Sequence, residues 1–252
     1  MQGGQQMKLQ GKVAVVTGGS RGLGKEMVRA FAAEGARVVI ASRKFEPCAE
    51  LAEAVQTEFG VAALPVACNV GDWGQCDELV ERVHSEFGQA DVLVNNAGIS
   101  PLYPSIDAVS EALFDKVIGV NLKGPFRLAA LFGTQMAAGR GGTIINISSV
   151  AAVHPRPHAL PYAAAKAGLN TLTKGLAQTL GPTVRVNGIQ CGPFLTDIAA
   201  DWDPAMQAEF EKDLALRRCG RPDEVVGAAL YFATDASSFA TGTIIELDGG
   251  RS

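Results

Sequence analysis

Short runs of β-branched and aliphatic residues alternate along this chain with longer stretches of helical period. The predicted strands are residues 12–17, 38–41, 62–66, 92–95, 143–147, 184–187 and 243–246. The predicted helices are residues 22–34, 46–58, 73–86, 111–138, 160–180 and 222–234. Nearly continuous apolar strands separated by helices are typical of a parallel sheet that is buried on both faces. The sequence therefore predicts a doubly wound α/β fold of about seven strands, with helices on both faces.

In such a sheet the carboxyl ends of all strands lie at one edge, where ligands bind. We therefore expect the functional residues just after the strands. The least regular segment is 191–218, between the sixth strand and the last helix. A connection of this length is usually functional, so we expect it to be a lid over the substrate.

The chain has 252 residues, enough to bury a core without disulfides or a structural metal. We found no low-complexity linker, so residues 11–252 are expected to form a single domain. Residues 3–7 (GGQQM) resemble part of an expression leader. Residues 1–10 are therefore interpreted as a leader outside the fold.

The charge is close to balanced, with 22 basic and 26 acidic residues and a net charge of −4. No run of like charges appears, which argues against nucleic acid or an anionic membrane as a partner and favours a small molecule. No apolar stretch approaches the roughly 18 residues of a membrane span, and the polar start lacks the apolar core of a signal peptide. We expect a cytoplasmic protein.

The five cysteines are odd in number and include no CxxC pair, so neither a disulfide framework nor a zinc site is expected. His154 and His158 have the i, i+4 spacing of a helical metal site, but Pro155 and Pro157 interrupt any helix there. A loop beside the substrate entrance is the preferred interpretation, and no metal is predicted. Trp202 falls in the segment expected to cover the substrate.

Glycine is abundant, with 29 residues, and its placement after the first strand is informative. Gly18 permits a tight turn, while Gly22 and Gly24 let the backbone approach a phosphate at the start of a helix. At the start of a strand–helix–strand unit, this spacing favours a dinucleotide site over a simple turn. The predicted cofactor contacts in this turn are Gly18, Ser20, Arg21, Gly22, Leu23 and Gly24.

The end of the second strand indicates which dinucleotide is bound. Sites for NAD usually place a carboxylate there, whereas NADP sites place an arginine for the 2′-phosphate. Here the strand ends in Ser42 and Arg43, and Arg21 adds a second cation. Guanidinium groups suit a phosphate dianion, so NADP is predicted, with contacts from Ser42 and Arg43. The alternative is that Arg43 is a solvated surface residue.

Tyr162 and Lys166 are four residues apart in a predicted helix, which places them on one face, about 6 Å apart along the axis. Tyrosine ionises near pH ~10, so proton exchange at neutral pH calls for a nearby positive charge. Lys166 is placed to supply it. The YxxxK spacing alone is common and usually marks an exposed helix face.

The motifs together are far more specific. The glycine turn, the sequence Asn95-Asn96-Ala97-Gly98 after the fourth strand, Asn121, Ser149, and the Tyr162/Lys166 pair resemble the short-chain dehydrogenase/reductase superfamily. The resemblance is to its single-domain branch of about this length, which includes 3-oxoacyl reductases. It extends from about Lys12 to Gly250 and implies a Rossmann fold.

The resemblance implies roles for four catalytic residues. Tyr162 is the general acid or base, and Ser149 polarises the substrate carbonyl. Lys166 lowers the tyrosine pKa and binds the nicotinamide ribose, and Asn121 completes a water-linked proton relay. Ser149 is preferred to Ser148 because its spacing to Tyr162 fits the family pattern. The implied reaction is reversible hydride transfer between a nicotinamide and a ketone or secondary alcohol.

Two segments depart from the family pattern. Cys68-Asn69-Val70 stands where an aspartate usually lies beside the adenine, and an amide can still hydrogen-bond there. After the sixth strand the order is Cys191-Gly192-Pro193-Phe194, and Cys191 is interpreted as a packing residue. The further cofactor contacts that the resemblance implies are Asn69, Val70, Asn96, Ala97, Gly98, Tyr162, Lys166, Gly192, Phe194 and Thr196.

The sequence as a whole favours an NADP-dependent carbonyl reductase or alcohol dehydrogenase. A 3-oxoacyl thioester is the leading substrate, while sugar acids, steroids and other secondary alcohols stay open. Two alternatives are a catalytically silent NADP-binding module, and a dehydratase or epimerase on the same scaffold. The resemblance also implies a homo-oligomer, commonly a tetramer, with the long helices and the carboxyl terminus between subunits.

Overall fold

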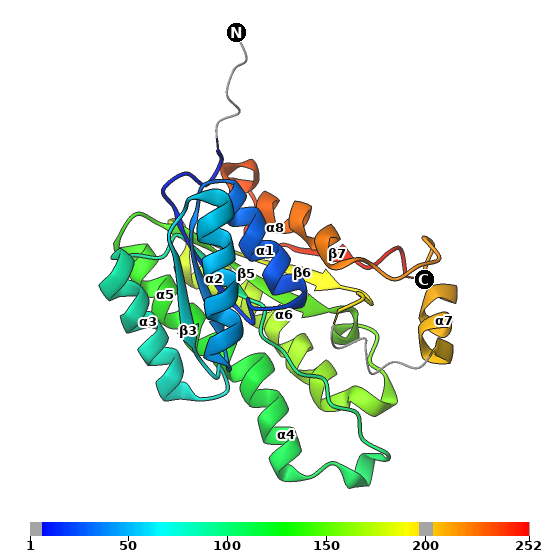
Figure 1. Cartoon of the computed structure of the whole chain (residues 1–252). Helices are drawn as coiled ribbons and strands as arrows, with labels where there is room; N and C mark the ends of the chain where they lie inside the picture. Colours follow the sequence, from blue (N-terminus) through cyan, green and yellow to red (C-terminus); the bar gives the residue numbers. More distant parts are fainter. Residues whose placement is uncertain (1–6, 197–203, 252) are drawn as a thin grey trace.

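The computed structural model describes residues 7–196 and 204–251. They form one sheet of seven parallel strands in the order β3-β2-β1-β4-β5-β6-β7 (Figure 1). The strands are β1 (Val13–Thr17), β2 (Arg37–Ser42), β3 (Ala63–Ala67), β4 (Val92–Asn95), β5 (Gly142–Ser149), β6 (Val184–Cys191) and β7 (Ile244–Leu247). This confirms the predicted doubly wound α/β fold.

Helices cover both faces of the sheet. They are α1 (Gly22–Ala33), α2 (Phe45–Phe59), α3 (Trp73–Phe87), α4 (Glu111–Ile118), α5 (Gly124–Ala138), α6 (Leu160–Leu180), α7 (Pro204–Lys212) and α8 (Val226–Ala233). Figure 1 shows α1, α2 and α8 on one face and α3, α5 and α6 on the other. Within the two described ranges, no helix is both long and apolar enough to cross a membrane.

The core consists of two apolar layers that share the sheet. Ala14 and Val16 of β1 face the layer that contains Phe31 of α1, while Val13 and Val15 face the layer that contains Phe132 of α5. Successive strand residues point to opposite faces. Because both faces are covered, every residue of β1 is buried, which explains its uninterrupted apolar sequence.

The order of the strands reverses beside β1, which pairs with β2 on one side and with β4 on the other. The connections after β1 and β4 therefore run to opposite faces at the carboxyl edge, the place where sheets of this kind bind ligands in a crevice. Strand β5 lies next to β4. The segments after β1, β4 and β5 thus meet at this edge.

Two sequence-based expectations need correction. The single helix predicted for 111–138 is divided into α4 and α5 by a π-helical segment, Gly119–Lys123. A hydrophobic period of 3.6 does not register one wider turn. The helix predicted for 222–234 likewise begins as a 3-10 turn at Pro222–Val225 and continues as α8.

The segment 191–218 is more regular than we expected. Strand β6 extends to Cys191, and α7 lies within the segment. The sequence of α7, PAMQAEFEK, is short and polar, so it carries no apolar stripe that would predict a helix. Trp202 lies outside the described residues, so its expected place over the substrate is not described.

The last residues of the chain pair with the segment after α7. The backbone amide of Leu216 donates to the carbonyl of Gly249 (3.0 Å), and that of Ala215 donates to the carbonyl of Gly250 (2.9 Å). Both glycines have positive φ angles, 74° and 75°. The carboxyl terminus is therefore held against the segment expected to cover the substrate.

The start of α1 lies very close to the turn after β1. A Cβ atom at Gly24 would overlap the carbonyl oxygen of Gly18 and lie 2.6 Å from Nδ2 of Asn96. Gly175, on the exposed side of α6, has open space in the same position. A side chain is therefore sterically excluded at Gly24 but not at Gly175.

We expect Gly24→Ala to lower the free energy of unfolding by about 1–3 kcal/mol, because the added methyl group meets rigid backbone. Gly175→Ala should raise it by about 0.5–1 kcal/mol, because alanine is the better helix former. Urea unfolding followed by circular dichroism measures both. Equal effects of the two substitutions would contradict the close approach of α1.

Candidate active site

Thr17, the last residue of β1, ties the loop after β4 to the glycine turn. Its hydroxyl accepts hydrogen bonds from the backbone amides of Asn96 (3.0 Å) and Ala97 (3.1 Å) and donates to the carbonyl of Val94 (3.2 Å). The Asn96 side chain donates in return to the carbonyls of Thr17 (2.8 Å) and Gly18 (3.1 Å). The sequence analysis did not single out Thr17, although a polar residue that ends an apolar strand is a signal that could have found it.

The glycine turn itself has the shape that an anion site requires. Gly18 and Gly22 have positive φ angles of 61° and 51°, which favour glycine. Arg21 precedes α1 in extended conformation, no side chain caps the first turn of α1, and that turn holds no acidic residue. The first amides of a helix and its dipole attract a phosphate. The turn therefore fits the diphosphate of a dinucleotide.

Ser20 and Ser42 link this turn to the end of β2. The Ser20 hydroxyl donates to the hydroxyl of Ser42 (3.0 Å). Arg21 and Arg43 flank the two serines in sequence, and both are exposed. Each serine of this link is thus followed in sequence by an exposed arginine.

The loop after β3 is held by its own polar groups. Asn69 Oδ1 accepts from the amide of Gly71 (3.2 Å), and the amide of Asn69 donates to Oε1 of Gln75 (2.9 Å). Asn69 is exposed and Val70 is buried. Asn69 therefore presents a fixed polar group at the sheet edge where the family places adenine.

Tyr162, Lys166 and Ser149 lie together at the ends of β5 and α6. Lys166 Nζ is 5.6 Å from the centre of the Tyr162 ring, and the hydroxyls of Tyr162 and Ser149 are hydrogen bonded. Lys166 is buried, and its ammonium donates to the carbonyl of Ile147 (2.8 Å). Three of the four predicted catalytic side chains therefore form one cluster.

The pKa values of this cluster follow from burial. Burial raises the pKa of Tyr162 to about 12, although the hydrogen bond with Ser149 opposes the change. Burial also lowers the pKa of Lys166 to about 8. The net shift at Tyr162 is opposite to the decrease expected from Lys166, because desolvation of the phenolate outweighs it. At neutral pH both residues hold their protons.

Asn121 occupies the π-helical segment between α4 and α5. Its Nδ2 donates to the carbonyls of Ile99 (2.9 Å) and Val117 (2.9 Å), and its Oδ1 accepts from the amide of Ile99 (3.2 Å). A Cβ atom on Gly98 would lie 3.0 Å from Asn121 Oδ1 and 3.8 Å from Lys166 Nζ. Asn121 and Lys166 thus both lie beside Gly98, and a side chain there would press on Asn121. Single π-helical turns are frequent at functional sites.

A buried polar network beneath these residues was missed by the sequence analysis. Asn95 Nδ2 donates to Oδ1 of Asn146 (2.9 Å), and Asn146 Nδ2 donates to Oγ1 of Thr173 (2.9 Å). Thr173 in turn donates to the carbonyl of Leu169 (2.8 Å). The network joins β4, β5 and α6. Two asparagines within apolar strands were the available signal.

The segment after β6 runs along the other side of the crevice. The amide of Leu195 donates to the carbonyl of Gly220 (2.8 Å), and the amide of Gly220 donates to that of Pro193 (2.9 Å). A Cβ atom on Gly22 would lie 3.5 Å from Cβ of Thr196. The predicted contact Thr196 therefore lies next to the glycine turn, and Phe194 is buried against Gly220.

Cys191 is buried at the end of β6. Burial raises the pKa of its thiol to about 12, although the charge of Lys166 opposes the change. The thiol therefore keeps its proton at neutral pH, which agrees with a packing role. Gly192 follows it closely against Asp248, where a Cβ atom would lie 2.6 Å from Cα of Asp248.

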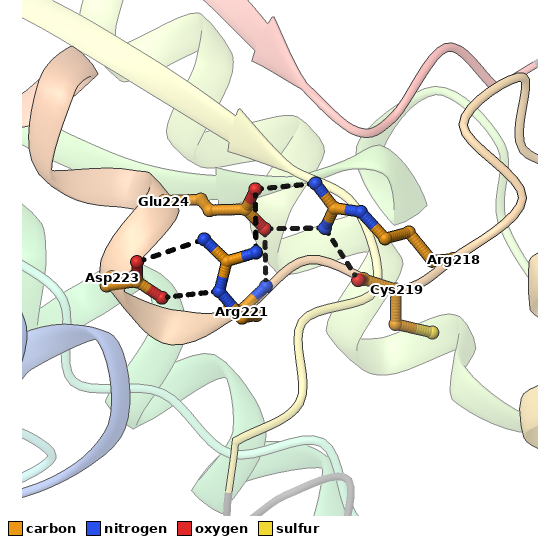
Figure 2. Close-up of polar contacts among 5 residues, drawn as sticks. All are labelled: Arg218, Cys219, Arg221, Asp223 and Glu224. Carbon is orange, nitrogen blue, oxygen red and sulfur yellow. Dashed lines mark hydrogen bonds and ion pairs between the residues drawn. The ribbon is translucent and has the colours of Figure 1, made fainter.

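A group of charged residues stabilises the segment 218–224, whose Gly220 pairs with residues 193–195 (Figure 2). The Arg218 guanidinium binds both carboxylate oxygens of Glu224 (2.7 and 2.6 Å), and Glu224 also accepts from the amide of Arg221 (2.7 Å). Hydrogen bonds from Arg218 lower the pKa of Glu224 to about 2. Arg221 also pairs with Asp223. These residues belong to none of the motifs recognised in the sequence, so their contacts were not predicted.

The loop after Ser149 contacts both neighbouring segments. Tyr103 donates its hydroxyl hydrogen to the carbonyl of Pro157 (2.7 Å) and accepts from the amide of Leu160 (2.9 Å). The Arg156 guanidinium lies 4.0 Å from the ring centre of Phe210 on α7. His154 and His158 lie in this loop, and His158 is in a 3-10 turn. Among the described residues, no group of three potential ligands is placed to hold a metal ion.

Comparison with known proteins agrees with this geometry. Residues 12–207 match the family model described as short chain dehydrogenase. The 3-oxoacyl-(acyl-carrier-protein) reductase FabG of Thermotoga maritima is 37% identical over 245 residues, which cover 97% of this chain and 99% of that protein. The 3beta-hydroxysteroid dehydrogenase 1 of Eggerthella lenta is 39% identical over 251 residues, covering 96% and 94%.

Solved structures show the same fold. A gluconate 5-dehydrogenase from Burkholderia cenocepacia, in complex with NADP and tartrate, superposes with a TM-score of 0.91. It is 34% identical, and the match covers 97% of this chain and 96% of that one. The sheet order, the glycine turn and the cluster at the end of β5 are thus accompanied by similarity along nearly the whole chain. The protein belongs to the short-chain dehydrogenase family of oxidoreductases.

Proposed function

We propose that the protein is an NADP-preferring oxidoreductase that moves a hydride between the nicotinamide and a ketone or secondary alcohol. The observation that carries the proposal is the cluster of Tyr162, Ser149 and Lys166 at the same sheet edge as the glycine turn. A phosphate site and a proton donor at one edge suit hydride transfer coupled to proton transfer. A nucleotide-binding module without activity would not need the second of these.

In the proposed mechanism a bound nicotinamide would supply the hydride, and side chains of the protein would supply and replace the proton. The Ser149 hydroxyl donates a hydrogen bond to the substrate oxygen. Tyr162 keeps its proton at neutral pH and delivers it to that oxygen as negative charge develops there. The Lys166 ammonium stabilises the phenolate that remains, and Asn121 positions the relay that returns a proton to Tyr162.

NADP preference is supported by the end of β2. The hydroxyls of Ser20 and Ser42 and the exposed guanidiniums of Arg21 and Arg43 provide donors for a 2′-phosphate. The related gluconate 5-dehydrogenase was solved with NADP. The other proposed cofactor contacts are Gly18, Gly22, Leu23, Gly24, Asn69, Val70, Asn96, Ala97, Gly98, Tyr162, Lys166, Gly192, Phe194 and Thr196.

The proposed substrate is a 3-oxoacyl thioester, by similarity to the Thermotoga maritima reductase. The steroid and gluconate dehydrogenases among the relatives keep steroids and sugar acids as alternatives. We propose that residues 11–252 form one domain and that the segment 191–218 is the substrate lid. The stacking of Arg156 on Phe210 supports the lid, because it places α7 against the loop after Ser149.

A cytoplasmic homotetramer is part of the proposal. Phe114 of α4 and Phe126 of α5 are 45% and 40% exposed. Exposed aromatic side chains on neighbouring helices support a contact between subunits. Light scattering of the purified protein tests the tetramer, and a monomeric mass would contradict it.

A panel of candidate ketones, tested as substrates, distinguishes the possible substrate classes. We expect NADPH oxidation, followed by its absorbance, with a 3-oxoacyl thioester in preference to a keto sugar acid or a 3-ketosteroid. A different preference would replace the proposed substrate and leave the reaction class intact. Binding of NADPH without turnover of any ketone would favour the silent binding module.

We expect Arg43→Asp to move cofactor preference from NADPH to NADH, because a carboxylate repels the 2′-phosphate and accepts from a ribose hydroxyl. The loss of one charged hydrogen bond, about 1.5–3 kcal/mol, should lower kcat/KM for NADPH by at least about tenfold. Steady-state kinetics with both cofactors measure the change. Arg82→Asp on α3, where Arg82 is 60% exposed, is the control for charge alone. Unchanged preference in Arg43→Asp would contradict the assignment.

We expect Tyr162→Phe to lower kcat by about 10²–10⁴-fold, the usual contribution of a general acid. The substitution removes only a hydroxyl, so NADPH binding, measured by fluorescence, should persist. Tyr231→Phe on α8 removes a hydroxyl from a side chain that is 42% exposed and should leave kcat unchanged. Turnover retained by Tyr162→Phe would exclude it as the proton donor.

A further inference from the structure

Two thiols that the proposed mechanism does not use meet beneath the loop after β3. Cys68 follows β3, and Cys76 lies in the first turns of α3. The two side chains are only 3% and 0% exposed, and Cys68 Sγ lies 3.5 Å from the carbonyl of Gln75, the residue next to Cys76. Two buried thiols from separate elements, held this near to one another, are the arrangement from which a disulfide forms.

The two cysteines enclose the segment that contains Asn69 and Val70. Cys68 Sγ lies 3.5 Å from the carbonyl of Gln75, and Cys76 Sγ lies 3.4 Å from the carbonyl of Val70. Each thiol is therefore in hydrogen-bond range of the backbone of this segment. A change at the sulfurs would reach the segment directly.

The two thiols differ in how readily they lose a proton. The Cys68 thiol stabilises a thiolate at Cys76, which lowers the pKa of Cys76 and raises that of Cys68. The Arg127 guanidinium acts in the same direction on Cys76. The thiolate is the reactive form of cysteine, and the nearby Arg127 favours it at Cys76, so we take Cys76 as the attacking sulfur and Cys68 as the resolving one.

We propose that Cys68 and Cys76 are a redox site that closes to a disulfide when the protein meets a hydroperoxide, and that closure weakens binding of the cofactor's adenine end. The second half rests on the proposed function, because it takes Asn69 and Val70 as adenine contacts. The first half is independent of it.

The chemistry balances with the hydroperoxide as oxidant. The Cys76 thiolate attacks one oxygen of hydrogen peroxide, the O–O bond breaks, and Cys76 becomes a sulfenic acid. The hydroxide that leaves takes up the proton that Cys76 lost on ionising and becomes the first water. Cys68 sulfur then attacks the Cys76 sulfur, the S–O bond breaks, and the hydroxide takes the Cys68 proton as a second water. Two thiols are oxidised by two electrons, and hydrogen peroxide is reduced to two waters.

Closure has a structural cost in the loop. The sulfurs must approach to about 2.05 Å, and both lose the hydrogens directed at their surroundings. The carbonyl of Val70 is also packed against α5, where a Cβ atom on Gly124 would overlap it. The backbone of Val70 therefore has little room to follow the Cys76 thiol that contacts it. The adjustment falls instead on the exposed side of the loop, which includes Asn69.

Opening of the segment between the two cysteines would admit an oxidant. Asn69, Asp72, Trp73 and Gly74 are exposed and lie between the two cysteines in sequence. Local opening of such a loop needs less free energy than unfolding of the sheet. The other three cysteines have different neighbours: Cys48 lies beside Ser42, Cys191 beside Lys166, and Cys219 is buried near Glu211.

The test treats the reduced full-length protein with hydrogen peroxide and counts thiols under denaturing conditions. We expect two of the five thiols to be lost, with an intact mass lower by two hydrogen atoms and a Cys68–Cys76 cross-link in the peptide map. Dithiothreitol should restore all five. The Kd for NADPH, measured by fluorescence, should rise about tenfold on oxidation, the scale of one lost hydrogen bond.

Three variants serve as controls. Cys68→Ala and Cys76→Ala should each abolish the cross-link and the change in Kd, while Cys219→Ala should keep both. Circular dichroism of each variant verifies the fold, and the wild-type thiol count stands alone if a variant fails to fold. Survival of five thiols, or oxidation of Cys76 without a cross-link, would overturn the proposal. A cross-link with unchanged Kd would overturn its second half. Failure of the reduced protein to bind NADPH would refute the proposed function, while thiol count and mass would still decide the disulfide.

Discussion

The Thr17 hydroxyl accepts hydrogen bonds from two backbone amides of the loop after β4 and donates one to the carbonyl of Val94. The shape of the proposed cofactor site depends on these bonds. They hold the loop after β4 beside the glycine turn. The side chain of Asn96 then closes on the carbonyls of the same turn, and α1 packs so closely that Gly24 has no room for a side chain. Loss of the hydroxyl would remove the hydrogen bond of the half-buried Ala97 amide, at a cost of about 1–3 kcal/mol, while the Asn96 amide would keep its bond to the carbonyl of Val94.

Helix α6 holds the proposed catalytic residues in place beside this site. Its Thr173 binds Asn146 of β5, and its Lys166 binds the carbonyl of Ile147 on the same strand. Tyr162 is thereby fixed relative to Ser149, which ends that strand. Burial of Lys166 lowers its pKa towards neutrality, and burying an ammonium is unfavourable unless it is hydrogen bonded. The site thus retains the positive charge of Lys166 although burial disfavours it.

The features that the sequence predicted are those set by local pattern. Apolar strands, the glycine turn and the i, i+4 pair of Tyr162 and Lys166 follow from residue spacing, and the structure brings them to one edge. The π-helical turn at Asn121 and the short polar helix α7 were missed because neither changes hydrophobic periodicity. The Tyr103 contacts were missed because they are tertiary, and the Arg218–Glu224 pair because it depends on the local path of the backbone between the two residues. Burial raises the pKa of Tyr162, an effect of desolvation that residue spacing does not reveal.

The contact between Arg156 and Phe210 has a thermodynamic consequence. Any displacement of α7 must separate the guanidinium from the ring, at a cost of about 0.5–2 kcal/mol. Arg156 belongs to the loop that runs from Ser149 to Tyr162. In the proposed lid, admission of a substrate past α7 and alignment of the proposed catalytic residues are therefore linked equilibria, so selection among substrates would include the work of opening as well as the fit of the pocket.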